Sequence, residues 1–234
     1  MKILGIDSSG TVAGAAIVED DIVVAEYTVN YKKTHSETLL PMIDEVVSMT
    51  DTRLEDIDAI AIAAGPGSFT GLRIGAATAK GLGLALDKPI VSVPTCEGLA
   101  YNMWGFNGFV CPIMDARRSQ VYTGIYDPEC MAVIMDQTAM GIEELIAYID
   151  ENISGDDAVI CFVGDGVPVY RDIIDEKLAC AHVYAPAHMN RQRAAAVASL
   201  GEIYMKQGKC ESADEHKPIY LRKSQAERER EARV

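Results

Sequence analysis

Three strand-like runs fill the first thirty residues, and the short turns between them restrict the fold more than any other feature of the chain. The runs cover residues 2–7, 13–18 and 22–29, and they are separated by Ser8-Ser9-Gly10-Thr11 and Glu19-Asp20-Asp21. Both connections have compositions typical of turns. Strands joined by connections this short pair antiparallel. We therefore expect a three-stranded antiparallel meander at the start of the chain.

The remainder of each half follows one order of elements. In the first half, helical periodicity covers 35–50 and 70–86, apolar runs at 57–64 and 90–93 are typical of buried strands, and a helix fits 95–104. The second half has strand-like runs at 109–114, 119–126 and 131–135, then a helix at 141–150, a strand at 159–163, a helix at 168–176, a strand at 182–184 and a helix at 191–206. The same order of elements is thus predicted twice, although no sequence repeat accompanies it.

Three antiparallel strands extended by parallel strands form the ribonuclease-H-like plan. Two such units in tandem give the two-lobed α/β architecture of actin, the sugar kinases and the heat-shock ATPases. We expect residues 1–104 to form the N-terminal lobe and residues 105–210 the C-terminal lobe, with a boundary near Trp104–Phe109. The tail, 211–234, is expected to pack back on the N-terminal lobe.

Composition and charge exclude several classes of protein. Of the 234 residues, 49% are hydrophobic, yet no apolar run reaches the roughly 18 residues that a membrane span needs. The net charge of −14 argues against nucleic-acid binding by this chain alone, because neutralising phosphate requires a basic surface. Six dispersed cysteines and no visible signal peptide predict a cytoplasmic protein with reduced thiols. Residues 220–233 mix Arg and Lys with Glu, which fits a solvated helix face or an RNA-contacting tail.

Two turns and one loop stand where a two-lobed ATPase binds its nucleotide. The first turn is Asp7-Ser8-Ser9-Gly10-Thr11. Its small residues would allow backbone N–H groups to approach phosphate, but a plain polar turn has the same composition. The second turn, Asp115-Ala116-Arg117-Arg118, has arginines where such a loop usually has glycine. We expect at most a vestigial site with weak ADP or ATP binding, and no required cofactor. Its residues would be Asp7, Ser8, Ser9, Gly10, Arg117, Gly164, Asp165 and Gly166.

A glycine-rich block, residues 65–73, leads from a buried strand into a helix. It could hold an anion at the helix N-terminus, but it lacks the pattern of a P-loop or of a dinucleotide fingerprint. The helix carries small residues at 71, 75, 76, 79, 81 and 83, which costs helix stability, up to about 1 kcal/mol for each glycine. We therefore expect another backbone to lie close to it, either within the fold or across a subunit interface.

The helix at 95–104 lacks the residues that a metalloenzyme would need there. Positions 95 and 99 share one helical face, where two histidines would grip one ion together. This chain has Thr95 and Leu99 instead, and leucine cannot ligate a metal. The histidines His182, His188 and His216 have no matching partners by spacing, and no nucleophile with its base can be assembled. We expect neither a catalytic residue nor a metal site.

Five segments together resemble one protein family. They are Gly5-Ile6-Asp7-Ser8-Ser9, the block from His35 to Pro41, the block from Gly65 to Gly75, Met114-Asp115-Ala116-Arg117-Arg118, and Tyr220-Leu221-Arg222. The chain is similar over nearly its whole length to the TsaB (YeaZ) family, bacterial accessory subunits in the synthesis of threonylcarbamoyladenosine in tRNA. The block from Gly65 to Arg73 is the most specific element.

The resemblance implies a two-lobed actin-like fold and a set of partners. It implies a homodimer, a heterodimer with the catalytic paralogue TsaD, recruitment of the ATPase TsaE, and contact with tRNA only through the complex. TsaD modifies adenosine 37 of tRNAs that read codons beginning with A, and its metal is held by a His-x-x-x-His pair that Thr95 and Leu99 do not reproduce. The implied interface lies on the helices near 36–50 and 70–86, with His35, Leu39, Ile43, Gly71, Leu72, Gly75, Ala76 and Ala79.

Three functions remain in competition. The leading hypothesis is a non-catalytic scaffold that activates TsaD. The alternatives are an ATPase or kinase-like enzyme with its own site, or a metallopeptidase, as the competing family label of glycoprotease suggests. If the small-residue face forms the dimer contact, Gly75→Arg is expected to abolish dimerisation and leave the monomer folded.

Overall fold

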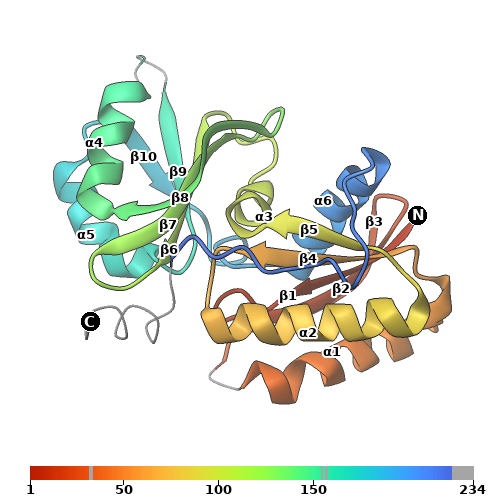
Figure 1. The fold of residues 1–234 in the computed structure, drawn as a ribbon. Helices are drawn as coiled ribbons and strands as arrows, with labels where there is room; N and C mark the ends of the chain where they lie inside the picture. The colour runs from red at the N-terminus through yellow and green to blue at the C-terminus, as the bar shows by residue number, and fades with distance from the viewer. Residues whose placement is uncertain (32–33, 154, 156–157, 223–234) are drawn as a thin grey trace, which may run out of the picture.

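The strands form two five-stranded sheets in the computed structural model, which describes residues 1–31, 34–153, 155 and 158–222 (Figure 1). The first sheet has the order β3-β2-β1-β4-β5, with β1 Lys2–Asp7, β2 Ala13–Glu19, β3 Ile22–Val29, β4 Ala59–Gly65 and β5 Ile90–Pro94. The second has the order β10-β9-β6-β7-β8, with β6 Phe109–Asp115, β7 Gln120–Asp127, β8 Ala132–Gly141, β9 Val159–Val163 and β10 Ala181–Tyr184. In each sheet the three strands that come first along the chain pair antiparallel, β1-β2-β3 in one and β6-β7-β8 in the other. The other two strands of each sheet are added parallel, beside β1 or β6. The predicted ribonuclease-H-like plan is confirmed for both units.

Two long helices cover one face of the first sheet. Helix α1, His35–Met49, buries Leu39, Met42, Ile43 and Val46, which recur at helical spacing and pack in the core with β1, β2 and β4. Helix α2, Phe69–Leu86, lies beside α1 on the same face (Figure 1). A short 3₁₀ turn, Leu54–Asp56, leads from α1 into β4.

Helix α6, Ala194–Lys206, covers the opposite face of the first sheet. Its Val197, Ala198 and Leu200 pack with apolar residues of β1, β2, β4 and β5. The helix approaches so closely that a Cβ on Gly5 would overlap the backbone of Ala194. The sequence places this helix in the second unit, and the structure corrects that placement. Periodicity identifies the apolar face of a helix but not the sheet that the face will meet.

The second sheet carries helices of its own. Helices α4, Ile142–Asn152, and α5, Val167–Lys177, share a core with β6, β7 and β9. Helix α3, Thr95–Tyr101, is shorter than predicted and contacts β5 and β4 on one side and β6 and β7 on the other. The two units therefore meet around α3. Among the described residues, none of the helices combines the length and the apolar character that crossing a membrane requires.

The chain after α6 returns along the first sheet toward the second (Figure 1). Glu211 forms a reciprocal backbone pair with Ile90, at 2.9 Å for both hydrogen bonds, which extends the sheet beyond β5. Further on, the Ile219 N–H donates to the Ala64 carbonyl at 2.7 Å, and Arg222 Nη1 donates to the Ala116 carbonyl at 2.6 Å. The described part of the tail thus packs on the first unit and touches the second. Residues 223–234, which the predicted tail includes, lie outside the described residues.

Candidate functional site

The two predicted turns line one cleft between the units. A cavity of about 320 Å³ lies there, and its walls are Ser9, Gly10, Thr11, Gly67, Ser68, Met114, Asp115, Ala116, Arg117, Tyr122 and Asp165. Four residues of the predicted vestigial site, Ser9, Gly10, Arg117 and Asp165, are in that lining. Topology explains why they meet, because the turns after β1 and β6 and the loop after β9 all lie at the strand ends that face the other unit.

The first turn is closed by hydrogen bonds of its own. Asp7 Oδ1 accepts from the Ser9 N–H at 2.8 Å and from Ser9 Oγ at 2.7 Å, and Ser8 Oγ donates to the Gly71 carbonyl at 2.9 Å. His35 Nε2 donates to the Gly10 carbonyl at 2.8 Å and ties α1 to the turn. Burial raises the pKa of Asp7 to about 6, and the bonds from Ser9 oppose that shift. The Asp7 carboxylate therefore faces its own turn.

The second turn has an unusual backbone. Arg117, Arg118 and Ser119 all have positive φ, a conformation that non-glycine residues rarely adopt. Arg117 pairs with Asp115 at 3.5 Å, and its side chain is 88% exposed. Asp165 Oδ1 accepts from the Asp115 N–H at 3.2 Å, and burial raises the pKa of Asp165. Two carboxylates and one arginine thus stand where a phosphate loop would offer backbone N–H groups.

The glycines of the site serve close packing. A Cβ on Gly164 would overlap the Ile113 carbonyl of β6, and a Cβ on Gly166 would lie 2.8 Å from the same oxygen. Gly65 has φ +124°, and a Cβ there would overlap the backbone of Ile219 in the tail. Each glycine therefore allows another segment to lie against the turn.

Most residues of the predicted interface lie inside the first unit. Leu39, Ile43, Gly71, Leu72, Gly75, Ala76 and Ala79 are all buried within the first unit, and His35 is half-buried against the first turn. A Cβ on Gly71 would overlap the Ser8 carbonyl, and one on Gly75 would overlap Ser8 Oγ. The small face of α2 thus meets the turn after β1, which was the other alternative that the sequence left open.

The helix that lacks metal ligands lies in apolar surroundings. Thr95 and Leu99 are each 1% exposed, and Leu99 packs in a cluster with Cys96, Val110 and Tyr126. Within the part of the chain that the structure describes, no group of three or more His, Cys, Asp or Glu residues could hold a metal ion.

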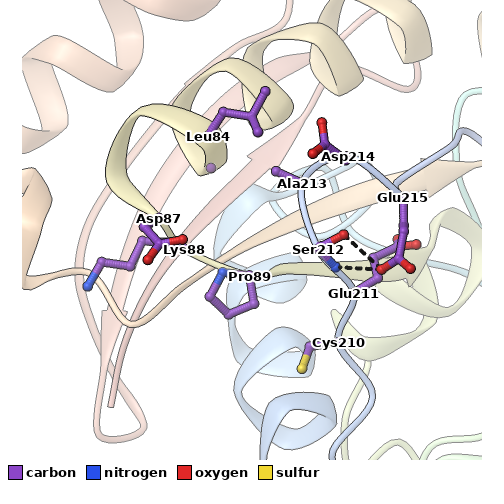
Figure 2. Close-up of a pocket in the computed structure, with 11 residues that line it drawn as sticks. Leu84, Asp87, Lys88, Pro89, Cys210, Glu211, Ser212, Ala213, Asp214 and Glu215 are labelled. Carbon is purple, nitrogen blue, oxygen red and sulfur yellow. Dashed lines mark hydrogen bonds between the residues drawn. The ribbon is translucent and has the colours of Figure 1, made fainter.

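A second cavity, of about 480 Å³, lies at the far end of α2 (Figure 2). Leu84, Asp87, Lys88 and Pro89 form one wall and the tail from Cys210 to Glu215 the other, with Ser212 donating twice to Glu215 Oε2. None of the predicted site residues lines it.

Two residues near the cleft could not have been found from the sequence. Gln192 is 1% exposed, a Cβ on Gly10 would lie 2.6 Å from its Nε2, and its amide has no hydrogen-bond partner among the described residues. Gln137 of β8 reaches the Gly65 carbonyl at 3.2 Å and joins the two units. Neither belongs to a motif, and both lie far along the chain from what they contact.

The paired sheets and the cleft between their turns define a two-lobed protein of the actin and sugar-kinase class. A family model described as TsaD, tRNA N6-adenosine threonylcarbamoyltransferase, matches residues 23–230. The chain is 36% identical over 232 residues to the tRNA threonylcarbamoyladenosine biosynthesis protein TsaB of Bacillus subtilis (strain 168), covering 97% of this chain and 96% of the relative. It is 29% identical over 233 residues to the protein of the same name from Escherichia coli (strain K12), with the same coverage.

A solved structure supports the fold independently. YeaZ from Pseudomonas aeruginosa superposes with a TM-score of 0.77 at 24% identity, over 94% of this chain and 99% of that one. Because the chain is 36% identical to the Bacillus relative over 97% of its length, it belongs to the TsaB (YeaZ) family.

Proposed function

We propose that this chain acts in the biosynthesis of threonylcarbamoyladenosine in tRNA as a non-catalytic subunit that activates TsaD. The observation that carries the proposal is Leu99, buried in an apolar cluster at the position where the family resemblance places a metal ligand of TsaD. A leucine side chain has no atom that can ligate a metal. Relatives named for this biosynthesis support the pathway.

The chemistry of the cleft supports an accessory role. Asp115 and Asp165 line it together with a single arginine that is already paired with Asp115. Carboxylates repel the phosphates of a nucleotide unless a cation intervenes. Tight binding of a triphosphate by this chain is therefore not expected.

The proposed partners are those that the family resemblance implies. We propose that the outer faces of α1 and α2 form the contact with TsaD or with a second copy, since Leu40, Met49 and Leu84 are 56%, 74% and 57% exposed there. TsaE would join the assembled complex in the cytoplasm, and tRNA would be bound by the complex.

Reconstitution tests the proposal. The purified chain, TsaD and the mixture are each supplied with threonylcarbamoyl-adenylate and unmodified tRNA, and modified nucleoside is measured by mass spectrometry. TsaE and ATP are present in every reaction. We expect no product from this chain without TsaD, and more product from the mixture of this chain with TsaD than from TsaD without this chain. Product from this chain alone, or no gain on mixing, would overturn the proposal.

The second candidate is a nucleotide enzyme, which the 320 Å³ cleft favours. Calorimetry with ATP and Mg²⁺ separates the two functions. Micromolar binding with turnover by the isolated chain would favour the enzyme, whereas weak ADP or ATP binding without turnover fits a vestigial site.

A further inference from the structure

Four arginines from three separate segments gather beside the cleft. Arg73 comes from the first turns of α2, Arg117 and Arg118 from the turn after β6, and Arg222 from the tail. Contacts link the segments, because Arg73 Nε donates to the Tyr220 hydroxyl at 3.4 Å and Arg222 Nη1 donates to the Ala116 carbonyl at 2.6 Å. We call the set of these four arginines with Phe69 and Tyr220 the arginine seam.

Aromatic rings lie between the arginines. The rings of Phe69 and Tyr220 are 4.6 Å apart between centroids, and the Arg73 guanidinium lies 4.0 Å from the centre of the Phe69 ring. Tyr220 is 40% exposed although it is aromatic. The seam therefore offers the exposed part of the Tyr220 ring as a stacking surface, as well as positive charge.

The charge of the seam contrasts with the rest of the molecule. The chain has a net charge of −14, and Arg53, Arg171 and Arg193 each pair with a carboxylate. Among the described residues, no carboxylate lies within 4.0 Å of the side-chain nitrogens of Arg73, Arg118 or Arg222. Two acidic groups line the neighbouring cleft: Asp115, which is paired with Arg117, and Asp165, which accepts from the Asp115 backbone N–H.

We propose that the arginine seam binds the phosphodiester backbone and an unpaired base of tRNA while the assembled complex modifies it. The inference rests on the proposed function, which supplies tRNA as the substrate. Guanidinium groups beside exposed aromatic rings are the combination that single-stranded nucleic acid recognises, with phosphates on the charges and bases on the rings. An acidic protein partner would bind the arginines but would have no use for the aromatic rings, so the rings favour nucleic acid as the ligand.

Binding of full-length tRNA to the complex of this chain with TsaD tests the seam. Affinity is measured by fluorescence anisotropy over a series of salt concentrations for the wild type, the double variant Arg73→Gln/Arg118→Gln, and the control Arg53→Gln, whose arginine is exposed and belongs to another part of the first unit. Each lost phosphate contact should reduce the slope of log K against log salt by about 0.7 to 0.9. We expect the double variant to bind about tenfold more weakly with a shallower slope, and the control to match the wild type.

A third variant separates stacking from charge. Tyr220→Leu should weaken tRNA binding about fivefold at every salt concentration and leave the slope unchanged, because base stacking releases no counterions. Size-exclusion chromatography of each variant with TsaD confirms that the complex still forms.

The outcomes for the seam and for the proposed function differ. If the complex forms and modifies tRNA but the double variant keeps the wild-type affinity and slope, the seam is wrong and the proposed function stands. If the double variant keeps tRNA but loses TsaE, the seam binds an acidic protein and the inference is overturned. If this chain and TsaD do not associate, the proposed function fails. Binding of tRNA to the isolated chain is then measured at low salt. Loss of this binding in the double variant supports the seam, and any other result refutes the seam.

Discussion

Gly71 and Gly75 place α2 directly against the turn that follows β1. The Gly71 carbonyl accepts from Ser8 Oγ, and neither position has room for a Cβ. Gly81 lies on the same helix, but a Cβ there would have nothing within 4 Å. The glycines of one helix therefore differ in what they contribute, and substitution can measure the difference.

We expect Gly71→Ala to lower the free energy of unfolding by about 3 kcal/mol, because the new methyl group would overlap a backbone oxygen that cannot swing away. Gly81→Ala is the matched control and should raise the free energy of unfolding by about 0.5–1 kcal/mol through helix propensity alone. Urea denaturation measures both. Equal effects of the two changes would show that α2 does not lie where the structure has it.

Asp7 predicts a dependence of stability on pH. The pKa of its carboxyl rises from 3.8 to about 6 because burial disfavours the charge. The folded state therefore holds the proton more tightly than the unfolded state does. The stability that the neutral form contributes is complete below 3.8 and is lost as the pH rises through about 6.

Asp7→Asn keeps an oxygen acceptor for Ser9 without the buried charge. We expect the variant to exceed the wild type in the free energy of unfolding by about 2–3 kcal/mol near pH 8, and by almost nothing near pH 4. Urea titrations at the two pH values provide the measurement. A difference that does not change with pH would contradict the raised pKa.

The sequence revealed the residues of the cleft better than their roles. The two-lobed plan assigned the turns after β1 and β6 and the loop after β9 to one site, and residues of all three, Ser9, Arg117 and Asp165, line the cleft although they come from two different sheets. The small residues of α2 predicted a close neighbour but could not identify it, since Ser8 and a partner subunit would demand the same lack of a side chain. Gln192 gave no signal, because its importance comes from a contact with Gly10 that only the folded chain creates.

At the scale of elements, helices α1 and α2 each have a buried and an exposed face. The buried face holds the residues that the sequence assigned to the interface, and the exposed face carries Leu40, Met49 and Leu84. Periodicity predicted both helices to within about two residues. It could not distinguish a face that meets the sheet from one that meets a partner, since both are apolar.

A charge on the exposed face should break the proposed contact with TsaD. We expect Leu40→Glu to weaken the association at least tenfold without changing the melting temperature, because a carboxylate would be buried without a partner there. Val169→Glu, on α5, is the control, since Val169 is 57% exposed and Leu40 is 56% exposed. Analytical ultracentrifugation measures both. Equal weakening by the two changes, or by neither, would place the interface elsewhere.

At the scale of the whole molecule, His216 anchors the C-terminal tail to the first unit. Its side chain is fully buried, with Nδ1 at 2.9 Å from Glu211 Oε1 and at 3.0 Å from Ser92 Oγ. Lys80 Nζ donates to the Asp214 and His216 carbonyls on the other side of the same bend. Beyond this bend the tail reaches the second unit, where Arg222 donates to the Ala116 carbonyl.

His216→Ala should lower the free energy of unfolding by about 2–3 kcal/mol, through the cavity and the lost hydrogen bonds. The neighbouring exposed residue provides the control, and Lys217→Ala should change the value by less than about 0.5 kcal/mol. Limited proteolysis should cut the His216→Ala tail faster than the wild-type tail. Equal rates of cutting and equal stabilities would mean that the tail is held elsewhere.

The late position of α6 in the chain affects how the protein folds during its synthesis on the ribosome. One side of the first sheet lacks most of its apolar cover until Ala194–Lys206 emerges, because Val197, Ala198 and Leu200 of that helix pack on the cluster of Ile3, Ala59 and Val91, to which α3 contributes Tyr101. The stretch of roughly 100 residues between β5 and α6 takes on the order of 5–20 s to translate. During that interval the nascent chain exposes an apolar surface. We therefore expect its yield in the cell to depend on chaperones and on the rate of translation as much as on the stability of the folded protein.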